Sequence, residues 1–113
     1  MKVYLSGPIS HNPDAEEQFS KAEEKVKLWA EEVSNPMQLG QYCPVKDNWA
    51  ELMKNAIKLM MECDSIYLIR GWGSSKGAIM EKFIAEELDM PIFYEEKGKM
   101  SEEWDQDYGQ GQI

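Results

Sequence analysis

The feature that most constrains the fold is a short run, Ser65–Ile69, that is apolar at nearly every position. A strand with water on one face alternates apolar and polar residues, whereas an unbroken apolar run is typical of a strand covered on both faces. Such strands occur in parallel sheets that have helices on both sides. The run therefore predicts an α/β fold.

Further strands are expected at Lys2–Leu5 and Pro91–Tyr94, with a weak edge strand at Glu32–Ser34. Strands that alternate with helices predict a flavodoxin-like or Rossmann-like three-layer sandwich with a parallel sheet of four or five strands. Such sheets bind ligands beyond the carboxyl ends of the strands, where the strand order reverses. If the first strand is central, this crevice lies between the loops that follow Leu5 and Ile69.

Three helices are expected between these strands, because apolar residues recur at spacings of three and four. The first begins at Asp14, which would cap it, with Glu17 three residues later; its apolar stripe consists of Phe19, Ala22, Val26, Trp29 and Val33. The second begins at Asn48, and its stripe consists of Trp49, Leu52, Met53, Ala56, Met60 and Cys63. The third spans Lys76–Leu88.

The length of 113 residues allows one domain with one core. We expect the domain at residues 1–94, followed by an acidic polar tail at 95–113 that is mobile or lies at an oligomer interface. Apolar residues make up 42% of the chain, too many for wholesale disorder, and no run approaches the roughly 20 residues of a membrane span. The apolar start is too short for a signal peptide, which predicts a cytoplasmic protein.

The net charge of −9 and a single arginine, Arg70, argue against a nucleic-acid polymer or an anionic membrane as partner. A small anionic ligand is still compatible, because one local pocket can oppose the overall charge. Cys43 and Cys63 have neither metal-site nor redox spacing, so we expect reduced packing cysteines. No cluster of Asp, Glu or His has metal spacing either, and neither a metal nor a cofactor is expected.

Glu81 is the main candidate for chemistry, because it falls on the apolar face of the third helix. At about 100° per residue, the residues within about 60° of it are Gly77, Ala78, Ile84, Ala85 and Leu88. The expected solvent side holds Lys76, Lys82, Glu86 and Glu87. A buried carboxylate costs several kcal/mol unless it finds partners, and such groups gather at functional sites. The structural alternative is a Glu81 that reaches solvent or meets a buried hydroxyl.

Other candidates lie beside Glu81 in the expected fold. Ser74 and Ser75 begin the third helix and would either cap it or hold an anion, with Gly77 leaving room for a ligand. Tyr4 faces away from its neighbours Val3 and Leu5 on the first strand, and is either a core tyrosine or a hydrogen-bond donor to Glu81.

These residues together resemble a known family, the nucleoside 2-deoxyribosyltransferase superfamily, and most of all its small phage and bacterial branch. The chain is also similar to the 2′-deoxynucleoside 5′-phosphate N-hydrolases. The resemblance extends from residue 2 to about 94, and its segments are Tyr4-Leu5-Ser6-Gly7-Pro8-Ile9, Asn12-Pro13-Asp14, Asn35-Pro36, Cys63-Asp64-Ser65-Ile66-Tyr67-Leu68 and Gly71-Trp72-x-x-Ser75-x-Gly77-Ala78-x-x-Glu81-x-x-x-Ala85.

The resemblance implies a flavodoxin-like sheet and chemistry at the N-glycosidic bond of a nucleoside or nucleotide. Glu81 would be the nucleophile at the anomeric carbon, through an oxocarbenium-like transition state, and Tyr4 would orient it. Ser75 and the helix start would hold a 5′-phosphate. The expected substrate-binding set is Ser6, Gly7, Pro8, Ile9, Trp72, Ser75 and Gly77. The resemblance also favours a homodimer or a higher homo-oligomer.

The acid that contacts the base in the nucleotide hydrolases has no counterpart here, because counting back from the third strand gives Ala56. Asp64 is expected to be a turn residue, and Asp14 or Asp47 could replace the acid. A catalytically silent nucleotide-binding module is therefore the alternative function, and an assembly protein with an acidic surface is a third.

Three further residues are weaker candidates. Trp72 would stack on a base or pack its loop onto the domain. Arg70 would clamp a phosphate or carboxylate, although the family motif does not require it. His11 is near the expected crevice but is interpreted as a solvated loop residue.

Overall fold

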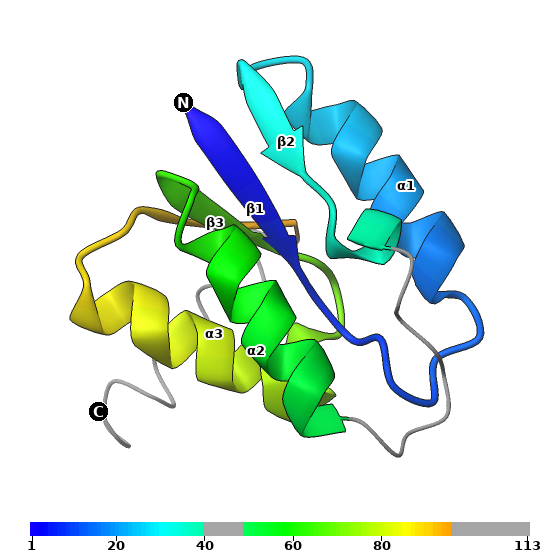
Figure 1. The fold of residues 1–113 in the computed structure, drawn as a ribbon. Helices are drawn as coiled ribbons and strands as arrows, with labels where there is room; N and C mark the ends of the chain where they lie inside the picture. The colour runs from blue at the N-terminus through cyan, green and yellow to red at the C-terminus, as the bar shows by residue number, and fades with distance from the viewer. Residues whose placement is uncertain (40–48, 96–113) are drawn as a thin grey trace.

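The computed structural model of the protein describes residues 1–39 and 49–95. Its elements are β1 (Lys2–Ser6), α1 (Ala15–Val26), β2 (Glu32–Ser34), the 3-10 helix η1 (Pro36–Leu39), α2 (Trp49–Met60), β3 (Ser65–Leu68), the 3-10 helix η2 (Trp72–Ser74), α3 (Lys76–Glu87) and β4 (Ile92–Tyr94). Strands and helices alternate along the chain as predicted (Figure 1). Among the described residues, no helix is both long and apolar enough to cross a membrane.

The four strands form one parallel sheet in the order β2-β1-β3-β4. In the central strand β1, Val3 pairs with Val33 of β2 on one side and with Ser65 of β3 on the other. The chain thus proceeds from β1 to one edge of the sheet and then returns to the other side of β1. This reversal between β1 and β3 is the point at which a flavodoxin-like sheet binds its ligand.

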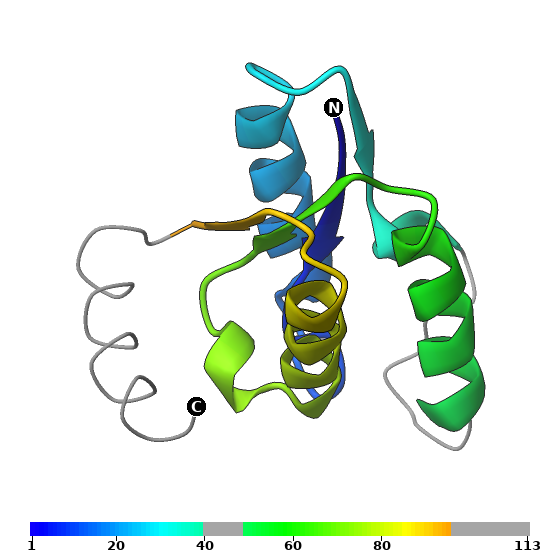
Figure 2. The ribbon, with the colours of Figure 1, turned by 90° about the vertical axis from the view of Figure 1, so that its left-hand side faces the viewer.

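The sheet lies between two layers of helices, so the predicted three-layer α/β sandwich is confirmed. Val3 and Leu5 of β1 pack with Phe19 of α1 on one face. Tyr4 of β1 packs with residues of α2 and α3, among them Ala56, on the other face. Figures 1 and 2 show α1 on one side of the sheet and α2 and α3 on the other. The alternation of β1 therefore decides which of its side chains can meet α3.

The first helix is shorter than its apolar spacing predicts. It ends at Val26, because the chain turns there to enter β2, where Val33 pairs with β1. Trp29, which continues the apolar spacing, lies beyond the helix and packs against Phe93. The two rings form an edge-to-face pair with 5.0 Å between their centroids. The predicted cap is also wrong: the Asp14 side chain makes no capping hydrogen bond, and the Asp14 backbone N–H donates to the Asn12 side chain.

The buried surface of α3 differs from the predicted stripe at two positions. Lys82, expected in solvent, is only 7% exposed; its ammonium pairs with Glu86 and lies 5.6 Å from the centre of the Trp72 ring. Leu88, expected to be buried, is 55% exposed just after the helix. Because α3 packs against η2 as well as the sheet, its buried surface is wider than one stripe, and the lysine stem fills the added part.

Candidate functional site

The Glu81 side chain points into the domain, as the helical wheel predicts. The residue is 4% exposed, and each oxygen of its carboxylate accepts one hydrogen bond. The Tyr4 hydroxyl donates to Oε2 at 2.8 Å, and the Ser6 hydroxyl donates to Oε1 at 2.6 Å. The interpretation of Glu81 as a side chain that reaches solvent is therefore wrong, whereas the alternative of a contact with a buried hydroxyl group and the possible hydrogen bond from Tyr4 are both found.

Both donors come from β1, two residues apart. Side chains at positions i and i+2 of a strand point to the same face of the sheet, here the face that α3 covers. Tyr4 begins farther from the carboxyl end of the strand but has a long side chain, whereas Ser6 begins closer and has a short one. Their hydroxyl groups therefore reach the same carboxylate. Ser6, expected to contact substrate, lines the small cavity and also donates to Glu81, which its position two residues after Tyr4 could have indicated.

The environment of Glu81 changes its acidity. Burial raises the pKa of the Glu81 carboxyl group to about 7, while the hydrogen bonds from Ser6 and then Tyr4 act in the opposite direction. Desolvation disfavours a charged carboxylate, and a hydrogen bond donated to that charge favours it. A group with this pKa changes its charge close to neutral pH, which suits a nucleophile or an acid-base group.

Glu81 lines a small cavity of about 40 Å³ between β1, α2 and α3. Next to it lies a large cavity of about 860 Å³. Both cavities are lined by Ser10, Trp49, Leu52, Ser75 and Gly77. The small cavity has room for about one water molecule rather than a sugar. A ligand that reached Glu81 would therefore lie mainly in the large cavity and touch the shared residues.

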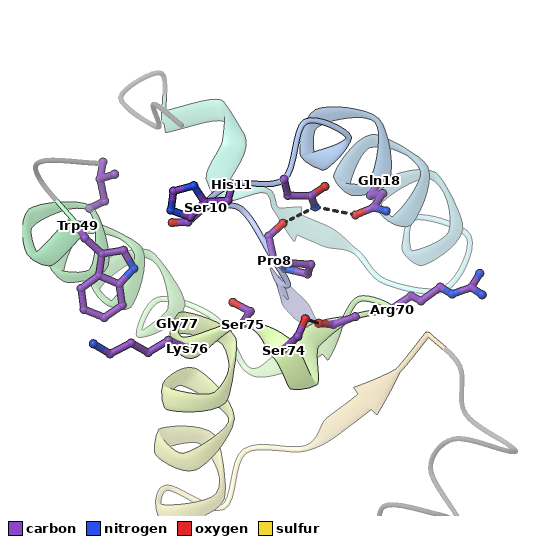
Figure 3. A pocket seen from close by; sticks show the side chains of 13 residues that line it. Pro8, Ser10, His11, Gln18, Trp49, Arg70, Ser74, Ser75, Lys76 and Gly77 are labelled. Atoms are coloured by element: carbon purple, nitrogen blue, oxygen red, sulfur yellow. Dashed lines mark hydrogen bonds between the residues drawn. The ribbon is translucent and has the colours of Figure 1, made fainter. Parts of the chain in front are cut away.

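The large cavity lies where the sequence predicts a crevice, between the loops that follow β1 and β3 (Figure 3). The described residues that line it are Pro8, Ser10, His11, Asn12, Gln18, Trp49, Leu52, Arg70, Gly71, Ser74, Ser75, Lys76 and Gly77. This set includes two cations, Arg70 and Lys76, and no carboxylate, although the chain has a net charge of −9. In Figure 3 the Arg70 side chain extends away from the cavity, and the Lys76 side chain extends beside Trp49.

Ser75 caps α3 and also lines both cavities. Its hydroxyl accepts a hydrogen bond from the Ala78 backbone N–H at 3.2 Å, which is the capping role that the sequence allows. The first N–H groups of a helix have no helical carbonyl partner and favour anions. The capping role and a role beside an anion are compatible, because the start of α3 lines the large cavity.

Glycines bring the loops around the site close together. Gly71 has a φ of 91°, a left-handed conformation that costs other residues strain. At Gly7, an added Cβ would lie 2.9 Å from the Ile69 Cβ, so the loop after β1 could not lie so close to the end of β3. Gly7 thus permits close backbone packing, besides lining the small cavity. Pro8 lines the large cavity and Ile9 the small one.

A family model described as a domain of unknown function, DUF4406, matches residues 1–94. The chain belongs to this family. No curated protein and no solved structure gives a significant match to the chain. Every described residue that lines the two cavities lies inside the matched DUF4406 region. The candidate site is therefore part of the family's domain.

Among the described residues of this DUF4406 domain, the tryptophan that lines the cavities is Trp49, and not the expected Trp72. Trp72 is 2% exposed, lies 5.9 Å from the Tyr94 ring and lines neither cavity, so it packs its loop onto the domain. Trp49 lines both cavities, and the Lys76 ammonium lies 4.6 Å from its ring centre. Sequence reasoning missed Trp49, because its place in an apolar helical stripe is also typical of a core residue.

Apart from Glu81, no carboxylate of residues 1–39 and 49–95 lines either cavity. Asp64 accepts a hydrogen bond from the Lys2 backbone N–H at 2.8 Å and is a structural residue, as predicted. Ala56 is buried in the core, and Asp14 is exposed. Asp47, like Cys43, lies outside the described residues. Within the described part of the chain, no three His, Cys, Asp or Glu residues form a group that could hold a metal ion.

Proposed function

We propose that the protein cleaves or transfers the N-glycosidic bond of a deoxynucleoside or its 5′-monophosphate, with Glu81 as the nucleophile. The observation that supports this most is a buried carboxylate, held by two hydroxyl donors, in a small cavity that adjoins a ligand-sized one. A carboxylate held in this way is oriented before substrate binds, which is what nucleophilic catalysis requires.

In the proposed reaction, a Glu81 oxygen attacks the anomeric carbon as the bond from that carbon to the base nitrogen breaks. The bonding electrons leave with the base, and the transition state resembles an oxocarbenium ion. Attack by water on the glycosyl-enzyme gives hydrolysis, and attack by a second base gives transfer. Tyr4 holds the carboxylate in place through its hydroxyl group. The step needs ionised Glu81, so its rate should rise with pH up to about 7.

The wall of the large cavity favours the 5′-monophosphate as the substrate. A volume of about 860 Å³ is in the range of small-molecule sites and holds a nucleotide. Lys76, the Ser75 hydroxyl and the start of α3 provide positive charge and N–H groups at one side of it. The Trp49 ring, at the junction of the cavities, supplies an apolar surface beside the sugar or the base.

The test is to incubate the protein with a panel of deoxynucleosides and their 5′-monophosphates and to measure free base by chromatography. We expect base release that increases about tenfold per pH unit below 7 and becomes constant above it. The variant Glu81→Gln should lose at least about 10³-fold of the rate, because an amide is no nucleophile. The control is Glu87→Gln, which changes an exposed acid of the same helix. Base release by Glu81→Gln at the parent rate would refute the proposal.

A second candidate is a nucleotide-binding module without turnover. It is favoured by one observation: among the described residues, no acid other than Glu81 lines the cavities and could protonate the leaving base. Such a module would show a higher melting temperature with nucleotide but release no base. The absence of a thermal shift with every nucleotide tested would eliminate it.

A further inference from the structure

Ser6 makes the shorter of the two hydrogen bonds to Glu81, and the reaction described above uses it only as one of the two donors that hold the carboxylate. We propose that Ser6 is a positioning residue that fixes the orientation of the Glu81 carboxylate and favours its ionised form. This proposal rests on the proposed function of Glu81, although its test includes a measurement that does not depend on turnover.

The first argument is geometric. A carboxylate held at one oxygen can still rotate about the bond that joins it to the side chain, whereas one held at both oxygens has a fixed plane. Tyr4 alone would hold only Oε2, and Ser6 supplies the second point by donating to Oε1. An ionised carboxylate has about four acceptor positions, so these two bonds leave others open for an incoming sugar carbon.

The second argument concerns the rigidity of Ser6 itself. The residue is 1% exposed and lies opposite Leu68 in the β1–β3 ladder. Its backbone carbonyl accepts a hydrogen bond from the Ile69 N–H at 2.8 Å, so the end of β1 is tied to the adjoining strand. Because the backbone is held and the side chain is short, the Ser6 hydroxyl can leave Glu81 only by rotation about its Cα–Cβ bond.

The third argument is that no described cation lines the small cavity that contains the Glu81 carboxylate. Besides Glu81, the lining of the small cavity consists of Tyr4, Leu5, Ser6, Gly7, Ile9, Ser10, Phe19, Pro36, Trp49, Leu52, Met53, Ser75, Gly77 and Ala78. Tyr4 is the one other titratable side chain in this set, and Lys76 lines only the large cavity. The two hydroxyl donors are therefore the groups that oppose the desolvation of the charge, and the bond from Ser6 lowers the pKa of Glu81 more than the bond from Tyr4.

The chain contains a matched control for removal of the Ser6 hydroxyl. Ser65 is another serine of the sheet. It lies on the adjoining strand β3 and is fully buried. Its hydroxyl has no hydrogen-bond partner among the described residues. Ser65→Ala therefore removes the same atom from a comparable position without changing the surroundings of Glu81, while Ser6→Ala removes one of its two donors.

We expect Ser6→Ala to raise the midpoint of the pH–rate profile for base release by about one to two units, the usual effect of one hydrogen bond to a charged group. From a midpoint of about 7, this lowers the rate at pH 7 by about 5- to 50-fold, and the loss should shrink toward pH 9. Ser65→Ala should keep the parent midpoint. A Ser6→Ala profile with the parent midpoint would overturn the role of Ser6 but not that of Glu81.

The readout without turnover is the ¹³C side-chain carboxyl resonance of Glu81, assigned by its loss in Glu81→Gln. Its titration midpoint should rise in Ser6→Ala and stay unchanged in Ser65→Ala, even if no nucleoside is cleaved. Ser6→Cys keeps a weak donor of similar size and should give an intermediate midpoint; it also serves if Ser6→Ala does not fold. Equal midpoints in the parent, Ser6→Ala and Ser6→Cys would refute the proposal.

Discussion

At the scale of single residues, Glu81 makes the fold less stable at neutral pH. Its carboxyl group has a pKa of about 7 in the folded protein, against 4.5 as the reference value for the unfolded chain. Between these two values the folded state binds more protons than the unfolded state. The free energy of unfolding therefore falls as the pH rises from 4.5 to 7, by about 3 kcal/mol at most, since one pKa unit corresponds to about 1.4 kcal/mol.

The variant Glu81→Gln removes this dependence, because an amide does not titrate. We expect the variant to gain stability over the parent as the pH rises, with a difference between pH 4 and pH 8 that reaches about 3 kcal/mol. Urea unfolding of both proteins at several pH values measures this difference in the free energy of unfolding. Parallel stability curves for the two proteins would show that the pKa of Glu81 is not raised.

The sequence indicated some residues of the site and not others, for physical reasons. The Glu81–Tyr4 pair was predictable, because helical and strand periods alone place both side chains between the helix and the sheet. That Trp49 rather than Trp72 lines the cavities was not predictable. An indole packs equally well in a core or against a ligand, and only the path of the loop shows that Trp72 lies under Tyr94.

At the scale of elements, the turn between β3 and α3 depends on one backbone conformation. Gly71 has a φ of 91° just before η2, and the turn carries Ser74 and Ser75 to the cavity. The Ser74 hydroxyl donates back to the Gly71 carbonyl at 2.9 Å, which closes the turn. A residue with a Cβ at position 71 would be strained in this conformation.

We therefore expect Gly71→Ala to lower the free energy of unfolding by about 1–2 kcal/mol, the usual cost of a left-handed conformation. The control is Gly73→Ala in the same turn, because Gly73 does not have a positive φ. Urea unfolding compares the two variants. An equal loss in both would mean that the strain at Gly71 is not the cause.

Element order was more predictable than element ends. The buried run at β3 indicated a parallel sheet, while the central position of β1 was only a condition for the expected crevice. The end of α1 was not predictable from spacing, because Trp29 and Val33 continue the apolar period for reasons of tertiary packing. The burial of Lys82 depends on η2 lying beside α3, which no local pattern contains.

At the scale of the whole molecule, the charge of the cavity wall differs from that of the chain. The net charge is −9, yet the described wall of the large cavity has Lys76 and Arg70 and no carboxylate. An anion would be repelled by the protein at a distance and attracted inside the cavity. Salt screens the distant repulsion more than the close contact.

Two lysine variants separate these contributions. Lys76→Met and Lys54→Met each lower the net charge by one unit, but only Lys76 lines the cavity; Lys54 pairs with Glu51 on α2. We expect Lys76→Met to weaken the binding of a nucleoside 5′-monophosphate about two- to fivefold, the usual contribution of an exposed charge pair. Lys54→Met should have a smaller effect that disappears at high salt. Equal weakening in calorimetric titrations would place the anion outside the cavity.

The two hydrogen bonds to Glu81 join residues that are 77 and 75 positions apart in the chain. Neither half of the polypeptide alone can contain both the acid and its donors. If the chain were divided between α2 and β3, one fragment would hold the two hydroxyl groups and the other the carboxylate. Only reassociation of the fragments would restore the hydrogen bonds between Glu81 and its donors. A Glu81 carboxyl group that titrates near neutral pH would therefore indicate that the two fragments have associated.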